Sequence, residues 1–335
     1  MKILSLWLTT CLLLLFNSCQ TEEPSPEGTR TTEEVIKQLS EQEDVTGNLN
    51  PFKLIENPEY IAVQEVDRMD EDDMVFITKA GGEVLVYPHR QMYVEVVNEE
   101  TNGVVMAITY CPITRSGINW NRVLGADTLL LTASGYLYKE NLMPLDVNSG
   151  NIWSQMLMRR FQGDARQGDI FAFRDLSNFP LIETKWRTVR DHFPEARVYF
   201  NDNSKKALAF APLEQQMGIV DRETVEIFTL EMFPGEIVLH LSARVPGGMI
   251  VVAGSSTHHY MLAFRTNYQM EPVEGAFPVI MQDNTGTLWN IFGEGVEGEH
   301  AGETLDSPLY FTAVDWAWRE LYEEVHLFQP KDLAE

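Results

Sequence analysis

Basic residues are scarce in this chain of 335 residues. It has 25 lysines and arginines against 50 aspartates and glutamates, a formal net charge of −25. Nucleic acids and anionic membrane surfaces are bound by clustered Lys and Arg, so this balance excludes both as expected partners. Hydrophobic residues, at 44%, are frequent enough for a packed core, which excludes a largely disordered chain.

Familiar catalytic motifs are missing as well. The chain contains no Gly-x-Ser-x-Gly nucleophile turn, no phosphate-binding loop and no His-Glu-x-x-His metal motif. The enzyme classes that these motifs define are therefore not expected.

The long apolar run of the sequence is confined to its start. Lys2 is followed by a mostly apolar stretch over 3–16, which ends at Ser18-Cys19. This run is shorter than the roughly 20 residues of a transmembrane helix and is typical of a secretory signal. We therefore predict a lipoprotein signal peptide over 1–18, with Cys19 as the lipidated residue. The alternative is an ordinary secretory signal in which Cys19 is incidental.

An acidic spacer follows Cys19. Residues 19–49 are rich in Pro, Gly, Ser and acids at first, and 31–44 have the spacing of a short amphipathic helix. Gln20-x-Glu22-Glu23 resembles the surface-export signal of Bacteroidota-type lipoproteins. We expect an exported protein that is anchored in the lipid bilayer of the cell envelope by its lipid. The expected location is the outer membrane, with surface exposure as an option.

Cysteine is rare, which limits the disulfide and thiol chemistry that is possible in the folded part of the chain. Of the three cysteines, Cys11 lies in the signal and Cys19 is the expected lipid site, so Cys111 alone remains in the body. An intrachain disulfide is therefore not expected there.

The body of the chain repeats itself. An Asn-x-Gly-x-x-Trp segment occurs at Asn148–Trp153 and again at Asn284–Trp289, each read as a tight turn that leads a Trp into the core. Similar features flank both copies in the same order. They are a Gly-led strand at Gly82–Val86 and Gly235–Leu239, another at Gly103–Ala107 and Gly248–Val252, and a Trp-Arg helix start at Trp186 and Trp318. The alternative is convergence of common turn sequences.

These patterns predict an α+β fold that is predominantly β. An ancestral duplication would give two similar β-rich halves, 50–200 and 201–335, each closed by a short C-terminal helix. Glycine-separated apolar runs such as Met74–Thr78 and Glu83–Tyr87 indicate hairpins. The second half is expected to pack on the first, with equivalent loops approaching one another.

The first half resembles a known family in five ordered motifs. They are Val86-Tyr87-Pro88, Glu95…Asn98, Tyr110-Cys111-Pro112, Ser134-Gly135-x-Leu137-Tyr138 and Asp146…Trp153-Ser154-Gln155. This is similar to the bacterial and archaeal family called domain of unknown function 3179. The resemblance covers roughly 50–200 and implies a scaffold whose activity is not established.

Two departures from the family pattern concern possible ligands of a metal. Where the family has His before Glu95 this chain has Val94, and where it has a second Cys this chain has Thr114. The resemblance thus implies a His, Glu and Cys-x-x-Cys set of which only Glu95 and Cys111 remain.

The remaining candidate residues are Cys111, Glu95 and Arg115 for catalysis, and Cys111, His258 and His259 for a metal such as zinc or copper. The duplication places the loop of His258 and His259 opposite that of Cys111 and Arg115, with only one His facing the site. The alternative to a functional site is that Cys111 is a buried core residue and that the two histidines are solvent-exposed loop residues.

Two functions follow from the sequence. The first is a non-catalytic lipoprotein that binds an unknown ligand or envelope protein between its halves. The second is a thiol- or metal-dependent enzyme with its site at the same interface. The acid excess predicts that the groove does not take anionic ligands.

Overall fold

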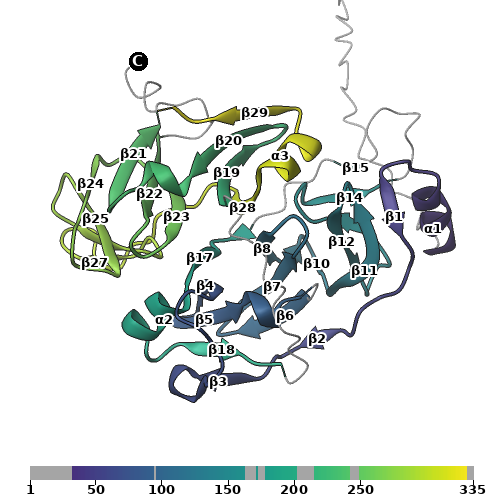
Figure 1. Cartoon of the computed structure of the whole chain (residues 1–335), viewed down its shortest axis with the longest axis horizontal. Coiled ribbons are helices and arrows are strands. Elements are labelled where there is room, and N and C mark those ends of the chain that lie inside the picture. The colour runs from purple at the N-terminus through teal and green to yellow at the C-terminus, as the bar shows by residue number, and fades with distance from the viewer. Residues whose placement is uncertain are drawn as a thin grey trace, which may run out of the picture.

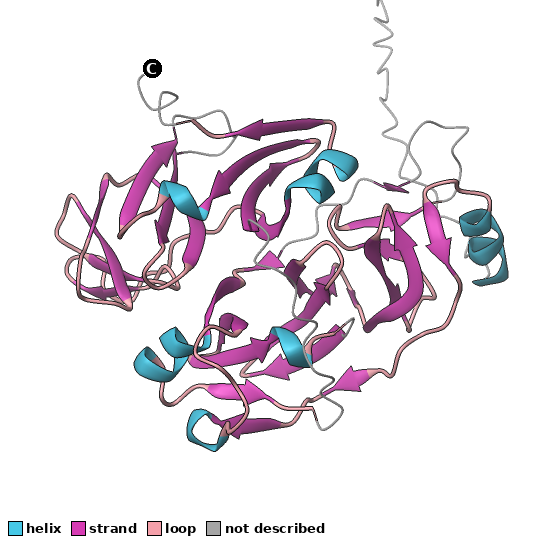
Figure 2. Cartoon of the chain, in the orientation of Figure 1, coloured by secondary structure: helices cyan, strands magenta, loops and turns pink. Residues whose placement is uncertain are grey.

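The computed structural model describes residues 32–93, 96–162, 171–172, 178–201, 215–241 and 249–329. Strands dominate these residues, and the described part of the chain has three α-helices (Figure 2). The fold is α+β and predominantly β, as predicted. No helix within these ranges is both long and apolar enough to cross a membrane.

The first core sheet is built around the predicted hairpin. β4 (Met74–Ala80) and β5 (Glu83–Pro88) pair antiparallel through the turn at Gly81-Gly82, where both glycines have positive φ. β17 (Ile182–Lys185) lies antiparallel to β4, and β18 (Arg197–Tyr199) lies parallel to β5. β3 (Tyr60–Ala62) completes the sheet. Helix α2 (Trp186–His192) connects β17 to β18.

A second set of four strands has the same connectivity. β19 (Gln215–Asp221) and β20 (Thr224–Thr229) form an antiparallel hairpin, β28 (Tyr310–Val314) lies antiparallel to β19, and β29 (Glu324–Leu327) lies parallel to β20. Helix α3 (Asp315–Leu321) connects the last two strands. Both halves thus end in a strand–helix–strand unit that completes the sheet. Common ancestry of the two halves stays a prediction.

Each half also inserts a three-stranded meander between its hairpin and its closing helix. The first meander is β6 (Val96–Thr101), β7 (Val104–Cys111) and β8 (Ser116–Asn121), and the second is β21 (Ile237–Leu241), β22 (Met249–Ser255) and β23 (Tyr260–Thr266). β8 pairs with β28 of the other half, and β23 lies beside β17 (Figure 1). The meander of each half therefore lies against the core strands of the other half.

The largest apolar core joins the two halves. It includes Val75, Ile182 and Trp186 from the first half with Met217 and Phe264 from the second. Burial of apolar area holds the halves together, since this core is continuous across them.

Smaller sheets lie at the two ends of the molecule (Figure 1). At one end, α1 (Thr32–Ser40) buries Val35 and Leu39 against the sheet β1 (Val45–Gly47), β11 (Leu131–Tyr138) and β12 (Asn141–Asp146). This confirms the predicted short amphipathic helix. At the other end lie β24 (Met270–Pro272), β25 (Val279–Asp283), β26 (Leu288–Asn290) and β27 (Gly295–Glu297).

The remaining strands are short. They are β2 (Ile55–Glu56), β9 (Val123–Leu124), β10 (Asp127–Thr128), β13 (Trp153–Ser154), β14 (Arg159–Phe161), β15 (Phe171–Ala172) and β16 (Asn178–Phe179).

Candidate functional site

Two turns of the same form lie where the two halves of the molecule meet. The β7–β8 turn closes between the paired residues Cys111 and Ser116, and the β22–β23 turn closes between Ser255 and Tyr260. In both, the last turn residue has left-handed backbone, with φ of 50° at Arg115 and 54° at His259. Such φ values are uncommon for residues with a side chain. The turns that the sequence comparison paired thus have the same backbone form.

Each turn is hydrogen-bonded to the strand–helix junction of the other half. The Thr114 carbonyl accepts from Val314 N, at 3.0 Å, where β28 meets α3. The His258 carbonyl accepts from the hydroxyls of Thr184 (2.6 Å) and Thr188 (3.2 Å), where β17 meets α2. These contacts fix Arg115 and His259 where the two halves meet.

A cavity of about 260 Å³ lies between these elements. Its apolar wall includes Met74, Leu230 and Met261, and residues of both halves contribute to its lining. The polar lining residues are Arg115, Glu183, Gln215, Thr229, Glu231, His259, Tyr260 and Thr312. A mostly apolar pocket with a few convergent polar groups is the usual form of a small-molecule site.

Glu183 is the buried acid of this cavity. It lies on β17, its side chain is 5% exposed, and its Oε2 accepts a hydrogen bond of 2.9 Å from the Thr312 hydroxyl of β28. Burial raises the pKa of Glu183 to about 8, and the Thr312 hydrogen bond and the Arg115 charge only partly oppose this rise. The carboxyl is therefore protonated at neutral pH.

His89 approaches the same carboxyl from the first half. It begins the 3-10 turn η2 (His89–Gln91) directly after Pro88, and its ring packs 4.2 Å from that of Phe76 and 4.7 Å from that of Tyr110. Burial, with the nearby charge of Arg115, lowers the pKa of His89 to about 3, so the ring is neutral.

The contact between His89 and Glu183 is close but poorly directed. His89 Nε2 lies 3.2 Å from Glu183 Oε1, yet this buried nitrogen has no hydrogen-bond partner. Gln215 Nε2, in the cavity lining, is also buried without one. Buried polar atoms are nearly always satisfied, so the unpaired Gln215 Nε2 of the cavity lining indicates a place for a polar ligand or water. His89 does not line the cavity, and it contacts the lining residue Glu183.

His259 lines the cavity, and its neighbour His258 does not. Burial, followed by the charges of Lys185 and Arg187, lowers the pKa of His259 to about 4. The His258 ring instead stacks on Phe277 at 4.1 Å, and its Nε2 is 3.5 Å from Glu236. Burial, with His192 nearby, lowers the pKa of His258.

Cys111 is directed elsewhere. Its side chain is 1% exposed, it lies in the apolar cluster of Trp153 and Met156, and its thiol points to the Glu140 carbonyl with a separation of 3.7 Å. It does not line the cavity that Arg115 and His259 share. Glu95 and Val94 lie outside the described residues. Within the described ranges, no three His, Cys, Asp or Glu residues are grouped as a metal would require.

Thr114, at the family's second cysteine position, belongs to a buried polar network. Its hydroxyl accepts from Asn141 Nδ2 (3.0 Å) and contacts the Ser116 hydroxyl (2.9 Å). Ser116 Oγ donates to Gln155 Oε1 (2.7 Å), and Gln155 Nε2 donates to Thr109 Oγ1 (2.9 Å). This network holds the β7–β8 turn against β12 without any charged group.

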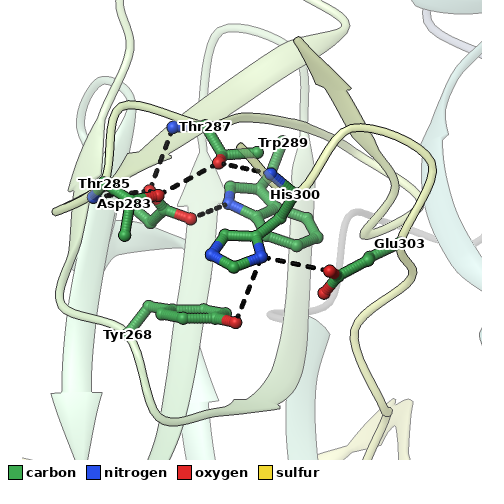
Figure 3. Close-up of polar contacts among 7 residues, drawn as sticks. All are labelled: Tyr268, Asp283, Thr285, Thr287, Trp289, His300 and Glu303. Carbon is green, nitrogen blue, oxygen red and sulfur yellow. Dashed lines mark hydrogen bonds and ion pairs between the residues drawn. The ribbon is translucent and has the colours of Figure 1, made fainter. Parts of the chain in front are cut away.

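The two Asn-x-Gly-x-x-Trp segments are structural, as predicted. Trp153 and Trp289 are both buried, and the turn residue Gly286 has a φ of 92°. In the second copy the Asp283 carboxylate accepts from Thr285 N, Thr287 N and Trp289 Nε1 at 2.8–3.0 Å, which fixes the indole (Figure 3).

A His–Glu pair lies beside this second turn. His300 Nδ1 lies 3.1 Å from Glu303 Oε1 and 3.4 Å from the Tyr268 hydroxyl (Figure 3). The hydrogen bond to Glu303 raises the pKa of His300. These three residues lie outside the cavity lining.

Comparison with known proteins supports the resemblance found in the first half. Residues 52–210 match the model of the family described as "Protein of unknown function (DUF3179)", and the chain resembles that family over this span. Neither the curated proteins nor the solved structures contain a match to the chain.

Sequence reasoning named Arg115 and His259 but missed Glu183 and His89. His89 directly follows the Tyr87-Pro88 motif, and Glu183 stands between Ile182 and Thr184 ahead of the Trp186 helix. An acid inside an otherwise buried strand is the signal that would have found Glu183.

Proposed function

We propose that this protein is an envelope lipoprotein whose body binds a small organic ligand in the cavity between its two halves. The supporting observation is the coincidence of a mostly apolar cavity of about 260 Å³ with a buried polar atom of its lining, Gln215 Nε2, that lacks a hydrogen-bond partner. An apolar cavity of about 150 Å³ is already large enough for benzene, so a larger organic molecule fits here. Lipidation of Cys19 would hold this binding module at the bilayer.

The polar groups of the cavity wall favour a ligand that also forms hydrogen bonds over one that is entirely apolar. Gln215 Nε2 is buried without a hydrogen-bond partner, and such a group costs about 1–3 kcal/mol. A ligand that accepts a hydrogen bond from it recovers part of this cost. Glu183, which is neutral and has an O–H to donate, adds a second polar contact to the same cavity.

One observation favours an enzyme as a second candidate. A carboxyl with a pKa of about 8 beside a neutral imidazole at 3.2 Å can give up and recover a proton near neutral pH. A carboxyl with a shifted pKa on a cavity wall is typical of acid–base catalysis. The catalytic acid of this alternative is Glu183, and Cys111 has no part in it.

Calorimetric titration with small organic probes tests the binding function. The full chain is reconstituted in nanodiscs and titrated with hexanol, hexanoate and hexylamine, with empty nanodiscs as the blank. We expect at least one probe to bind with one-to-one stoichiometry. Leu230→Trp, which fills the cavity, should abolish this binding, whereas Leu327→Trp on the exposed surface should not. Failure of all three probes would contradict the proposal.

The lipid anchor has its own test. Cells that express the full chain are labelled with a radioactive fatty acid, and Cys19→Ala is the matched control. Label in the wild-type protein but not in the variant supports the anchor at Cys19. Equal labelling, or none in either, overturns it.

A further inference from the structure

We propose that the ligand of this cavity is an uncharged molecule with a carbonyl oxygen, which accepts a hydrogen bond from Gln215 Nε2, and an apolar body that packs on Leu230 and Met261. This inference rests on the proposed binding function and names both the ligand class and the residue that selects it. It agrees with the expectation, drawn from the acidic composition, that the groove does not take anionic ligands.

Gln215 lies on a strand face that is otherwise apolar. Side chains alternate between the two faces of a strand, so Gln215, at the start of β19, shares a face with Met217 and Ile219. Those two residues are buried in the core that joins the halves. An apolar side chain would fill this position without a need for hydrogen bonds, so packing alone does not account for a glutamine here.

The donor of Gln215 differs from that of its neighbour. Gln216, on the other face of β19, donates from Nε2 to Asp315 Oδ1 at 3.1 Å. Gln215 Nε2 is buried and has no hydrogen-bond partner. Gln216 Oε1 also lacks one, but Gln216 does not line the cavity, whereas Gln215 does. Because buried donors are nearly always paired, the cavity is the place for the missing acceptor.

The backbone of Gln215 is held where the two halves meet. Gln215 pairs with Val314 of β28, and Val314 N donates to the Thr114 carbonyl of the first half at 3.0 Å. The donor thus stands on a paired strand, next to the contact between the halves. A polar group on a rigid element is better placed to select a ligand than one on a loop.

The cavity disfavours charge of either sign. Its lining residues Glu183 and His259 are both neutral at pH 7, because burial raises the pKa of the first to about 8 and lowers that of the second to about 4. A charged ligand would meet the same cost of desolvation. The charge of Arg115 already interacts with other groups of the protein. Glu231, on the 3-10 turn η4 (Leu230–Met232), is exposed, so water and salt screen it.

A carbonyl oxygen suits one unpaired donor better than a hydroxyl does. The carbonyl brings an acceptor and no donor of its own, so a single hydrogen bond satisfies both the ligand and Gln215 Nε2. A hydroxyl brings a further donor, which would need a second partner in a mostly apolar cavity. Ketones, esters and amides with an apolar body are therefore the expected ligand class.

A ketone and its hydrocarbon isostere test this class. Cyclohexanone and methylenecyclohexane share a ring and differ in the oxygen or methylene group attached to it. Calorimetric titration of the full chain in nanodiscs, with empty nanodiscs as the blank, should show one-to-one binding of both. Gln215→Met should weaken cyclohexanone about fivefold and leave methylenecyclohexane unchanged. Gln282→Met, at an exposed position outside the lining, should change neither.

Two charged probes and a stability measurement complete the test. Cyclohexanecarboxylate and cyclohexylammonium should bind at least about tenfold more weakly than cyclohexanone at pH 7, because either ion must be desolvated. Urea unfolding without ligand should show that Gln215→Met is at least as stable as the wild type, since the amide that it removes has no partner at Nε2.

The outcomes separate the two proposals. The same effect of Gln215→Met on cyclohexanone and methylenecyclohexane would overturn the carbonyl ligand and leave the binding function intact. Binding of a charged probe at least as tight as that of cyclohexanone, or a less stable Gln215→Met, would do the same. Absence of binding by these four probes and by the three hexyl probes would overturn both proposals.

Discussion

Two polar clusters lie on opposite sides of one turn and differ in how completely they are hydrogen-bonded. Thr114 and Ser116 enter a network with Asn141 and Gln155 in which no side-chain polar atom lacks a partner. Arg115, between Thr114 and Ser116 in sequence, lines the cavity, where Gln215 Nε2 is buried without a hydrogen-bond partner.

This difference in hydrogen bonding indicates different roles for the two clusters. A saturated network specifies one arrangement of the core, because each hydrogen bond is lost if the turn moves. An unsaturated cluster costs stability, and such a cost is common at sites where a ligand completes the hydrogen bonding. The first cluster therefore holds the turn, and the second is the one to which we propose that a ligand binds.

The largest expected effect concerns the acid of the unsaturated cluster. Glu183 has a folded-state pKa of about 8, raised from an ordinary value of 4.5, so the folded protein holds its proton more tightly. The stability that this provides is fully present below pH 4.5 and is lost as the pH rises to 8. The loss amounts to roughly 5 kcal/mol at 1.36 kcal/mol per pKa unit.

Denaturant unfolding of wild type and Glu183→Gln between pH 4.5 and 9 measures this loss. His89 and His259 act in the opposite direction below pH 6.5, because their folded-state pKa values are lowered. The difference between the two proteins removes this contribution and isolates Glu183. Parallel pH profiles for both proteins would show that the carboxyl is not buried in its neutral form.

The next largest effect concerns the saturated cluster. Gln155→Leu removes one hydrogen-bond partner each from Ser116 Oγ, Asn141 Nδ2 and Thr109 Oγ1 in a fully buried place. We expect a loss of about 3 kcal/mol in the free energy of unfolding, independent of pH, because each of the three buried hydrogen bonds contributes about 1 kcal/mol. Urea unfolding followed by circular dichroism measures it.

Glu183→Leu is the matched substitution in the other cluster. At pH 8 it should leave stability unchanged or higher, since it removes a buried acid that has begun to ionise, while it should weaken binding of the small organic probes. Equal destabilisation by Gln155→Leu and Glu183→Leu would erase the distinction between the two clusters.

Much of the fold was predictable because its signals are local. The β4–β5 hairpin, the α1 helix and the strand–helix closures at Trp186 and Trp318 follow from turns, periodicity and caps within short windows. The equivalence of the two central turns could also be predicted, because it depends on the order of motifs along the chain.

The site was only half predictable, because it depends on contacts between distant segments. Arg115 was named because it follows Cys111 closely in sequence, and His259 was found through the internal repeat. Glu183 owes its burial and its hydrogen bond to Thr312, which is 129 residues away in sequence. Its pKa is therefore a property of the packed halves, and no local pattern encodes it.

Substitution of Cys111 has the smallest expected effect on stability. It tests whether the thiol belongs to the structural cluster or to the cavity. Its thiol is 1% exposed and lies in the apolar cluster of Trp153, on the structural side of the turn. We expect iodoacetamide to label native Cys111 far more slowly than the urea-unfolded chain, because a buried thiol is reached only through opening of the fold.

A matched thiol two residues away provides the control. Ile113 is 44% exposed in the same turn, so Ile113→Cys in a Cys111→Ala background should be labelled rapidly in the native protein. Cys111→Ala itself should cost about 1–2 kcal/mol through loss of packing and leave binding of the small organic probes unchanged. Fast native labelling of Cys111, or loss of binding in Cys111→Ala, would place the thiol on the binding side of the turn, because only a group exposed in the cavity can react there or touch the ligand.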